Sequence, residues 1–413
     1  MQHCWGPDIL LNNNASPRKE IIINTCMSKS YSTEKVNLAA CLGIAFFGVA
    51  MLSLGAILPP LTKAVPQAIG LPMYMSVGII AGTVLFGPIM DRYGYKWLLI
   101  ASCLVMLCGL LILAYSTDMP LLTVGIFCVG FGGGVLNGET NAIVSDIYDE
   151  DRRGRKMSIL GACYCIGAMV WTLACIVVPN YKISLIACAV IMLLSVIFFI
   201  SIRFPKAKVT AATKPSGKEY RGMLTSAALL MVGFTLFFQS GFEGVSGSYT
   251  TSFLTKFGGI AEGDAVLSLT FFTVGMMIGR FALGAMMKKG RDIVVLFIYM
   301  LIALAGVVLL GWWTSYRVVA WIAMALIGFG VGATFPVMLA RLGGVFRRMS
   351  GSAFSAAIFI ALCGQFLGNF LVGRLFGSGE GFAFVYVLGG MIVAILILAP
   401  FASLACKKHG TNN

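Results

Sequence analysis

Long apolar runs separated by short polar connections make up most of this chain. Apolar stretches of about 20 residues recur from Val36 onward, and each is long enough to cross a bilayer as an α-helix. These runs are continuous and do not alternate in polarity, which excludes the strands of a membrane β-barrel. The pattern therefore predicts an all-α polytopic membrane protein.

Twelve transmembrane helices account for the apolar runs. A polar connection at residues 203–222 leaves six helices on each side of it and divides the chain into two halves. We expect an N-terminal tail at 1–35, a first half at 36–202, the linker at 203–222, a second half at 223–405 and a C-terminal tail at 406–413. The predicted helices are residues 36–58, 71–90, 96–115, 119–147, 156–178, 182–202, 223–248, 265–287, 292–312, 317–340, 350–375 and 381–404.

The N-terminal tail has no apolar core of the kind that a cleaved signal peptide requires, so we expect no cleaved leader. Met27 is a plausible initiating residue, and on that hypothesis residues 1–26 are not translated. N-terminal sequencing that found Met1 would contradict this hypothesis.

Positive charge is distributed unevenly between the two sides of the predicted membrane. The tails and the connections on their side hold 24 of the 30 lysines and arginines, whereas the opposite side holds four. Because cytoplasmic loops carry the excess of basic residues, we expect both termini in the cytoplasm. This asymmetry explains the net charge of +14 without nucleic acid as a partner.

Composition offers little support for metal, redox or enzymatic chemistry. The twelve cysteines lie mostly within apolar runs, where they act as small apolar residues, and the two histidines, His3 and His409, lie in the tails. We therefore predict no metal site, no disulfide and no cofactor. The chain also lacks a phosphate-binding loop and a nucleophile–base arrangement, so we do not expect an enzyme.

An internal repeat relates the two predicted halves. Gly130-Phe131-Gly132 in the fourth helix recurs as Gly328-Phe329-Gly330 in the tenth helix, 198 residues later, and Gly134 recurs as Gly332 at the same offset. A degenerate echo of the connection between the second and third helices appears at 284–291. Matching positions in the two halves indicate a parallel repeat of six helices.

The connection between the second and third helices has the most distinctive sequence. It reads Gly87-Pro88-Ile89-Met90-Asp91-Arg92-Tyr93-Gly94-Tyr95-Lys96. Gly94 permits a turn with positive φ, and Gly87 allows a neighbouring helix to approach closely. Asp91 and Arg92 fall at the lipid–water boundary, where charge is tolerated.

This spacing, G-x-x-x-D-R-x-G-x-K, resembles the same connection in the major facilitator superfamily of transporters. The resemblance covers about residues 36–405 and implies two pseudo-symmetric six-helix halves around a central substrate site. It also implies that a set of residues at one membrane surface latches the halves in one conformation, with Arg341 as an alternative latch partner. The latch set is Gly87, Asp91, Arg92, Gly94 and Asp146.

Only two of the 16 acidic residues fall well inside predicted helices. These are Glu139 in the fourth helix and Glu243 in the seventh, and each is a candidate to carry a coupling proton, since ionisable residues in a membrane are costly unless used or paired. A structural role, through pairing with a basic residue or placement in an aqueous vestibule, is the alternative for both.

Uncharged polar residues in the spans are candidates for binding the hydroxyl groups of a small-molecule substrate. Asn137 and Asn141 share one helix face, as do Gln365 and Asn369. Trp171 lies in mid-span, where its ring could stack on a sugar. Gln239 completes the set. Hydrogen bonding between helices is an equally weighted alternative for the asparagine pair.

Two segments resemble the fucose:proton symporter branch of the superfamily, which includes fucose and glucose/mannose permeases. They are the glycine-rich run into Asn141, with Asp146 five residues later, and the Gly241-Phe242-Glu243-Gly244 segment. The resemblance implies proton-coupled uptake of a monosaccharide by a monomer in a bacterial inner membrane. The pattern departs from the branch at Asn137, where an acid is usual, and the first helix lacks an acid.

A proton-coupled exporter of drugs or metabolites is the alternative function in the same fold. Such exporters commonly carry a Gly-Pro pair in the fifth helix, whereas this chain has no proline there before Pro179. The sequence therefore favours uptake over export.

The latch hypothesis predicts the effect of replacing Asp91 with asparagine. Asp91→Asn removes the charge that the motif places at the membrane surface, so we expect slower turnover with little change in substrate affinity. Transport rates measured over a range of substrate concentrations separate the two quantities. Normal turnover would show that the motif does not act as a latch.

Overall fold

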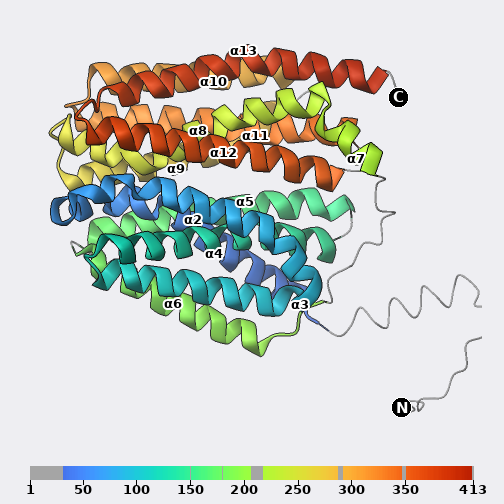
Figure 1. Ribbon diagram of the computed structural model, residues 1–413, viewed down its shortest axis with the longest axis horizontal. Helices are drawn as coiled ribbons and strands as arrows, with labels where there is room; N and C mark the ends of the chain where they lie inside the picture. Colours follow the sequence, from blue (N-terminus) through green and yellow to red (C-terminus); the bar gives the residue numbers. More distant parts are fainter. Residues whose placement is uncertain are drawn as a thin grey trace, which may run out of the picture.

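Long helices run side by side along the molecule in the computed structural model, and their connections gather at its two ends (Figure 1). The structure describes residues 31–148, 150–178, 180–205, 217–286, 292–346 and 350–411. All regular secondary structure within these ranges is helical. The predicted all-α fold class is confirmed.

The observed helices follow the predicted ones closely. One predicted pair is merged into α3, a short helix appears in the linker as α7, and α13 continues to Thr411, past the predicted end of the last helix. The helices are α2 (Thr33–Ala64), η2 (Pro66–Gly70), α3 (Leu71–Tyr115), α4 (Met119–Ile147), α5 (Glu150–Val177), α6 (Tyr181–Ser201), α7 (Gly217–Leu224), α8 (Ala227–Lys256), α9 (Glu262–Met286), α10 (Asp292–Trp312), α11 (Arg317–Val345), α12 (Ser350–Gly377) and α13 (Ala383–Thr411).

Twelve spans within the described residues are long and apolar enough to cross a membrane. The span Pro66–Phe86 comes from η2 and the first part of α3, and the span Tyr93–Tyr115 comes from the rest of α3. Many large apolar side chains on these helices point away from the bundle, as a surrounding bilayer requires. The chain is thus a multi-pass membrane protein.

Capping side chains fix where several helices begin. Ser32, Asp118 and Ser226 each accept a hydrogen bond from a backbone N–H in the first turn of α2, α4 and α8, at 3.4, 3.4 and 3.2 Å. Such side chains satisfy amide groups that have no partner within the helix.

The helices divide into two groups in space. In Figure 1, α2 to α6 form one side of the molecule and α8 to α13 form the other. In the first group α3 packs on α4 and α2 packs on α5, and in the second group α9 packs on α11 and α8 packs on α12. The same pattern of neighbours therefore appears in both groups, as the internal repeat predicts.

Glycines set the closest helix crossings, and their placement repeats between the halves. A Cβ atom on any glycine in two matching sets would press against backbone atoms of the neighbouring helix. Side chains this small let helices in a membrane approach to backbone contact. The sets are Gly78, Gly82, Gly130 and Gly134 where α3 meets α4, and Gly275, Gly279, Gly328 and Gly332 where α9 meets α11.

The change of chain direction within α3 depends on Gly94. This residue has φ 76° and ψ 170° and lies at the start of the second span of α3, so the predicted turn with positive φ is confirmed. The next residues anchor the turn: the Tyr95 hydroxyl donates to Asp146 of α4 at 2.7 Å, and Lys96 donates to the carbonyls of Ile200 and Ile202 at 2.7 and 3.0 Å. The motif thus joins α3 to α4 and to the end of α6.

Asp146, a predicted latch residue, therefore binds within its own half in this conformation. Partial burial and the Asp146 carboxylate raise the pKa of Tyr31, just before α2. The side chains of Asp91, Arg92 and position 87 lie outside the described residues, and their latch role stays a prediction.

Replacing Gly94 with alanine is expected to destabilise the protein by about 1–3 kcal/mol, because a side chain is strained at this φ and ψ. Thermal unfolding of the detergent-purified protein measures the loss. Gly222→Ala is a matched control, because a Cβ there meets no neighbour and its backbone is helical. Equal melting temperatures for the two variants would contradict the expectation.

Candidate functional site

The two halves meet along three pairs of helices: α2 with α8, α3 with α12, and α5 with α9. α7 and the end of α13 lie at one end of the bundle, on the right in Figure 1, and we call this the α7 end. The α2–α3 and α8–α9 connections lie at the other end, which we call the far end. The site is described from the far end inward.

Polar contacts close the interface between α3 and α12 near the far end. The amide nitrogen of Asn369 on α12 donates to the Ser76 hydroxyl of α3 at 3.0 Å. The Tyr249 hydroxyl of α8 donates between two carbonyl oxygens, that of Ile69 in η2 at 3.1 Å and that of Asn369 in α12 at 3.0 Å. Asn369 was predicted to bind substrate, and the structure places it in the contact between the halves.

The other two helix pairs carry matching contacts. Thr172 of α5 and Thr270 of α9 share a hydrogen bond of 2.7 Å, and Thr251 of α8 donates to the Gly55 carbonyl of α2. An exposed ion pair of 3.1 Å joins Lys63 to Glu262. Together with the Asn369 and Tyr249 contacts, these bonds form what we call the far-end seal.

A charged cluster lies further from the far end, between α5, α8 and α9. Arg280 of α9 places its guanidinium over the Tyr164 ring of α5, 5.5 Å from the centroid, and its Nη1 lies 4.0 Å from the Cys165 sulfur. Glu243 of α8 lies close enough to interact electrostatically with both Tyr164 and Arg280. The cluster therefore combines an acid and a base from one half with an aromatic ring from the other.

Glu139 occupies a different environment. It is 0% exposed, and both carboxylate oxygens lack a hydrogen-bond partner. The side chain lies beside Leu99 and Cys103 of α3, within the first half. Burying a carboxyl group without a hydrogen-bond partner is costly, because the group loses its contact with water.

Asn137 and Asn141 share a face of α4, as the sequence predicts. The Asn141 amide donates to the Asn137 carbonyl at 2.7 Å and to its side-chain oxygen at 3.3 Å. Asn141 is exposed and Asn137 is half-buried, whereas Glu139, between them in sequence, is buried. The structure therefore separates the asparagine pair from the acid between them, and their substrate role stays a prediction.

Buried polar atoms without partners concentrate on α8 and α12. Gln239 donates to the Val331 carbonyl at 3.2 Å but its oxygen has no partner, and the Gln365 amide nitrogen, packed against Gly244, has none either. The hydroxyls of Ser246 and other α8 serines are also unpaired. Such groups need an explanation, and a polar ligand is one.

The indole N–H of Trp171 makes a structural hydrogen bond. It donates to the Leu52 carbonyl of α2 at 3.2 Å, and the residue is 2% exposed. The bond ties α5 to α2 within the first half. Stacking of its ring on a substrate stays a prediction.

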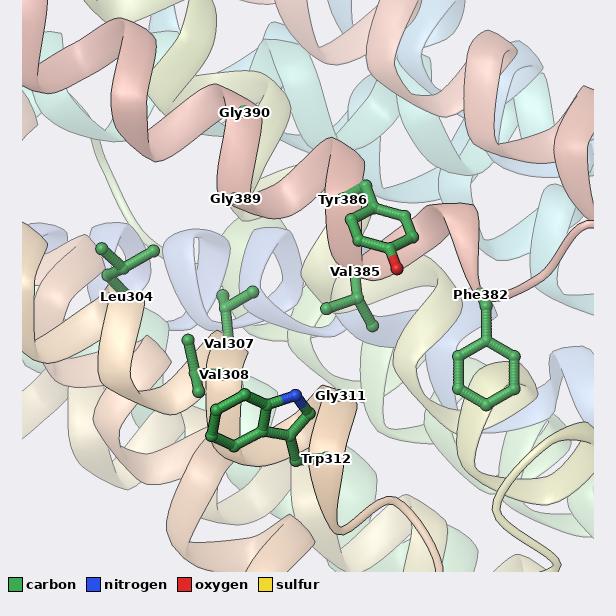
Figure 2. Close-up of a pocket in the computed structure, with 10 residues that line it drawn as sticks. All are labelled: Leu304, Val307, Val308, Gly311, Trp312, Phe382, Val385, Tyr386, Gly389 and Gly390. Carbon is green, nitrogen blue, oxygen red and sulfur yellow. The ribbon is translucent and has the colours of Figure 1, made fainter.

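A groove of about 380 Å³ lies between α10 and α13. Figure 2 shows Trp312 and Tyr386 on opposite walls, with Gly389 and Gly390 on α13. These two aromatic side chains are 77% and 80% exposed, and the lining is apolar. The groove therefore belongs to the outer surface of the second half and does not suit a polar substrate.

The sequence did not identify Tyr164, Thr172 or Thr270 as interface residues. Arg280 is a basic residue inside an apolar run, and the sequence does not identify the side chain that it contacts. Threonine and tyrosine are common in apolar spans, so no local signal marks those that face the other half. The described residues include no cluster of His, Cys, Asp and Glu that would hold a metal.

Two halves of six spans, related by a repeat and meeting around buried polar side chains, define the architecture of a secondary transporter. The chain belongs to the Major Facilitator Superfamily, because the sequence profile of that family matches residues 38–369. It is therefore a transporter and not an enzyme.

Several characterised proteins are similar to this chain. The glucose/mannose transporter of Bacillus subtilis (strain 168) is 23% identical over 350 residues, which are 80% of this chain and 86% of that protein. The D-xylose-proton symporter structure matches with a TM-score of 0.71 and 16% identity, over 89% of this chain and 97% of that one. The E. coli Fucose:proton symporter matches with a TM-score of 0.61 and 19% identity, over 89% and 98%.

Removing the Asn369 side chain is expected to loosen the far-end seal. Asn369→Ala deletes the bond to Ser76, worth about 0.5–1.5 kcal/mol net, so conformations that are open at the far end should become more populated. Spin labels at Thr117 and Ser315, exposed far-end positions in different halves, report the opening as longer distances.

Ser378→Ala is the control for this measurement, because the Ser378 hydroxyl bonds only to the Leu375 carbonyl of its own helix turn. If Asn369→Ala gives the same distance distribution as the control and the unsubstituted protein, Asn369 does not contribute to the seal.

Proposed function

We propose that this protein is a secondary active transporter that takes up a monosaccharide together with protons by alternating access. The observation that carries the proposal is the charged cluster where α5 of the first half meets α9 of the second, with Glu243 of α8 beside it. The unpaired amide groups of Gln239 and Gln365 lie on α8 and α12, the helices of the second half that pack on α2 and α3 of the first. A site between two halves that rock against each other can open to one side at a time.

Side-chain chemistry supports a polyhydroxylated substrate. An amide both donates and accepts hydrogen bonds, and sugar hydroxyls do the same. Gln239 has a free acceptor oxygen and Gln365 a free donor nitrogen, so the two could bind neighbouring hydroxyls. The proteins similar in sequence or fold are described as transporters of glucose or mannose, of xylose and of fucose.

Energy is proposed to come from a proton gradient. Two of the solved structures are described as proton symporters, and the spans of this chain contain two carboxyl groups that could carry a proton, Glu139 and Glu243. The far-end seal corresponds to a conformation closed at that end. Because basic residues are concentrated on the side of the termini, we expect the far end to face outward and both termini to lie in the cytoplasm. We expect the protein to act as a monomer in a bacterial inner membrane.

Uptake into proteoliposomes tests the proposal. The purified protein is reconstituted and offered labelled glucose, mannose, xylose and fucose, with and without an inwardly directed proton gradient. Accumulation of one sugar above its external concentration, only with the gradient, is the expected result. Absence of any sugar uptake by folded protein would contradict the proposal and favour the export of drugs or metabolites.

Substitution of Gln365 is expected to weaken sugar binding. Gln365→Leu keeps the packing volume but removes the amide, and the loss of one or two hydrogen bonds should raise the Kd about tenfold. Calorimetric or fluorescence titration with the transported sugar measures the change. Thr255→Ala, whose hydroxyl bonds within its own helix at 2.9 Å, is the control. An unchanged Kd would make Gln365 a packing residue.

A further inference from the structure

The two acids inside the spans differ in which helices surround them. Glu139 lies between α3 and α4, which belong to the same half, and it is fully buried. Glu243 is partly exposed and lies by α5 and α9, which belong to different halves. This difference bears on which acid can couple proton movement to transport.

A proton can drive a conformational change only if it binds the two conformations with different free energies. The neighbours of Glu139 belong to one half and pack through glycine crossings, so they stay together when the halves rock. The neighbours of Glu243 separate or rearrange when α5 moves against α9. Glu243 therefore has different surroundings in the two conformations.

Arg280 connects the charge of Glu243 to the opposite half. The ion pairs among the described residues are Lys63 with Glu262 and Arg317 with Asp264, so Arg280 takes part in neither. Its guanidinium lies instead over the Tyr164 ring, an arrangement that favours a cation. The contact of the Arg280 guanidinium with the Tyr164 ring thus stabilises the packing of α9 on α5.

Other charged groups lie away from this cluster. The helices around Glu243 supply Tyr164 and Cys165 from α5 and Arg280 from α9 as titratable or charged neighbours. The charged residues of α2 lie in its first and last turns, Arg374 of α12 lies over Phe370 in its last turn, and Arg341 of α11 donates to Ser403. Arg280 is therefore the cation that responds to the charge of Glu243.

We propose that Glu243 carries the coupling proton and that Arg280, held on Tyr164, is the positioning residue that transmits its charge to the other half. This assignment rests on the proposed function. When Glu243 is ionised, it attracts Arg280 and maintains the α5–α9 contact. When a proton from water on one side binds the carboxylate, that attraction is lost and the contact weakens; the proton then leaves to water on the other side.

Glu243→Gln tests the assignment because glutamine keeps the shape but cannot release a proton. With a gradient of about one pH unit, one-to-one coupling supports about tenfold accumulation of sugar. We expect Glu243→Gln to equilibrate sugar without accumulating it, while exchange of external for internal sugar continues. Glu243→Asp keeps a carboxyl group and should keep accumulation.

Two further variants complete the comparison. Glu380→Gln, on the exposed far-end connection, is the matched control and should accumulate sugar as the unsubstituted protein does. Glu139→Gln should also accumulate sugar, because its side chain lies inside one half. Accumulation by Glu243→Gln, or loss of accumulation with retained exchange in Glu139→Gln, would overturn the assignment.

The experiment separates this inference from the proposed function. Unsubstituted protein that exchanges sugar but shows no gradient-driven accumulation would contradict proton coupling itself. Unsubstituted protein that accumulates sugar, together with a Glu243→Gln variant that does so equally, would contradict only the role of Glu243.

The pH profile of uptake tests the positioning role of Arg280. In Arg280→Gln the ionised carboxylate loses a favourable charge, so the midpoint of the profile should move to higher pH. Tyr164→Leu should produce a larger shift in the same direction than Tyr164→Phe, because both variants lose the hydroxyl beside Glu243 but only Tyr164→Leu also removes the aromatic face that holds the guanidinium. An unchanged midpoint in Arg280→Gln would show that Arg280 serves packing alone.

Discussion

Backbone contact between helices at glycine is the constraint on which the rest of this structure depends. In a bilayer the helices gain no hydrophobic free energy by leaving lipid for one another, so association depends on van der Waals packing and hydrogen bonds. The crossings of α3 with α4 and of α9 with α11 reach backbone contact because glycine occupies matching positions in both halves. Each half can then move as one unit, and the interface between the halves is left to change.

Polar side chains are divided between three tasks at that interface. Asn369, Thr172 and Tyr249 hold the halves together near the far end. Gln239 on α8 and Gln365 on α12, the two helices that pack on α2 and α3 of the first half, keep unpaired polar atoms buried. The cluster around Arg280 places charge where the two halves touch. These tasks need residues of similar chemistry, so residue type alone does not distinguish them.

The sequence predicted the features that depend on local pattern. Apolar runs located the helices, the Gly130 repeat indicated the two halves, and Gly94 indicated the turn in α3 with its positive φ. Side-chain roles at the interface depend on which helix of the other half lies opposite, and helical periodicity does not contain that information. Asn369 lies in the seal against Ser76, for example, and its role in binding substrate stays a prediction.

The composition of the far-end seal sets how firmly this conformation is held. Apart from one exposed ion pair, its described bonds join neutral groups, each contributing about 0.5–1.5 kcal/mol net. Exposed ion pairs add about 0–1 kcal/mol and weaken as salt increases. Binding of a small molecule at micromolar to millimolar affinity releases about 4–8 kcal/mol, which is of the same order as the sum of these bonds. A closure built from such bonds is weak enough for substrate binding to reverse it in every cycle.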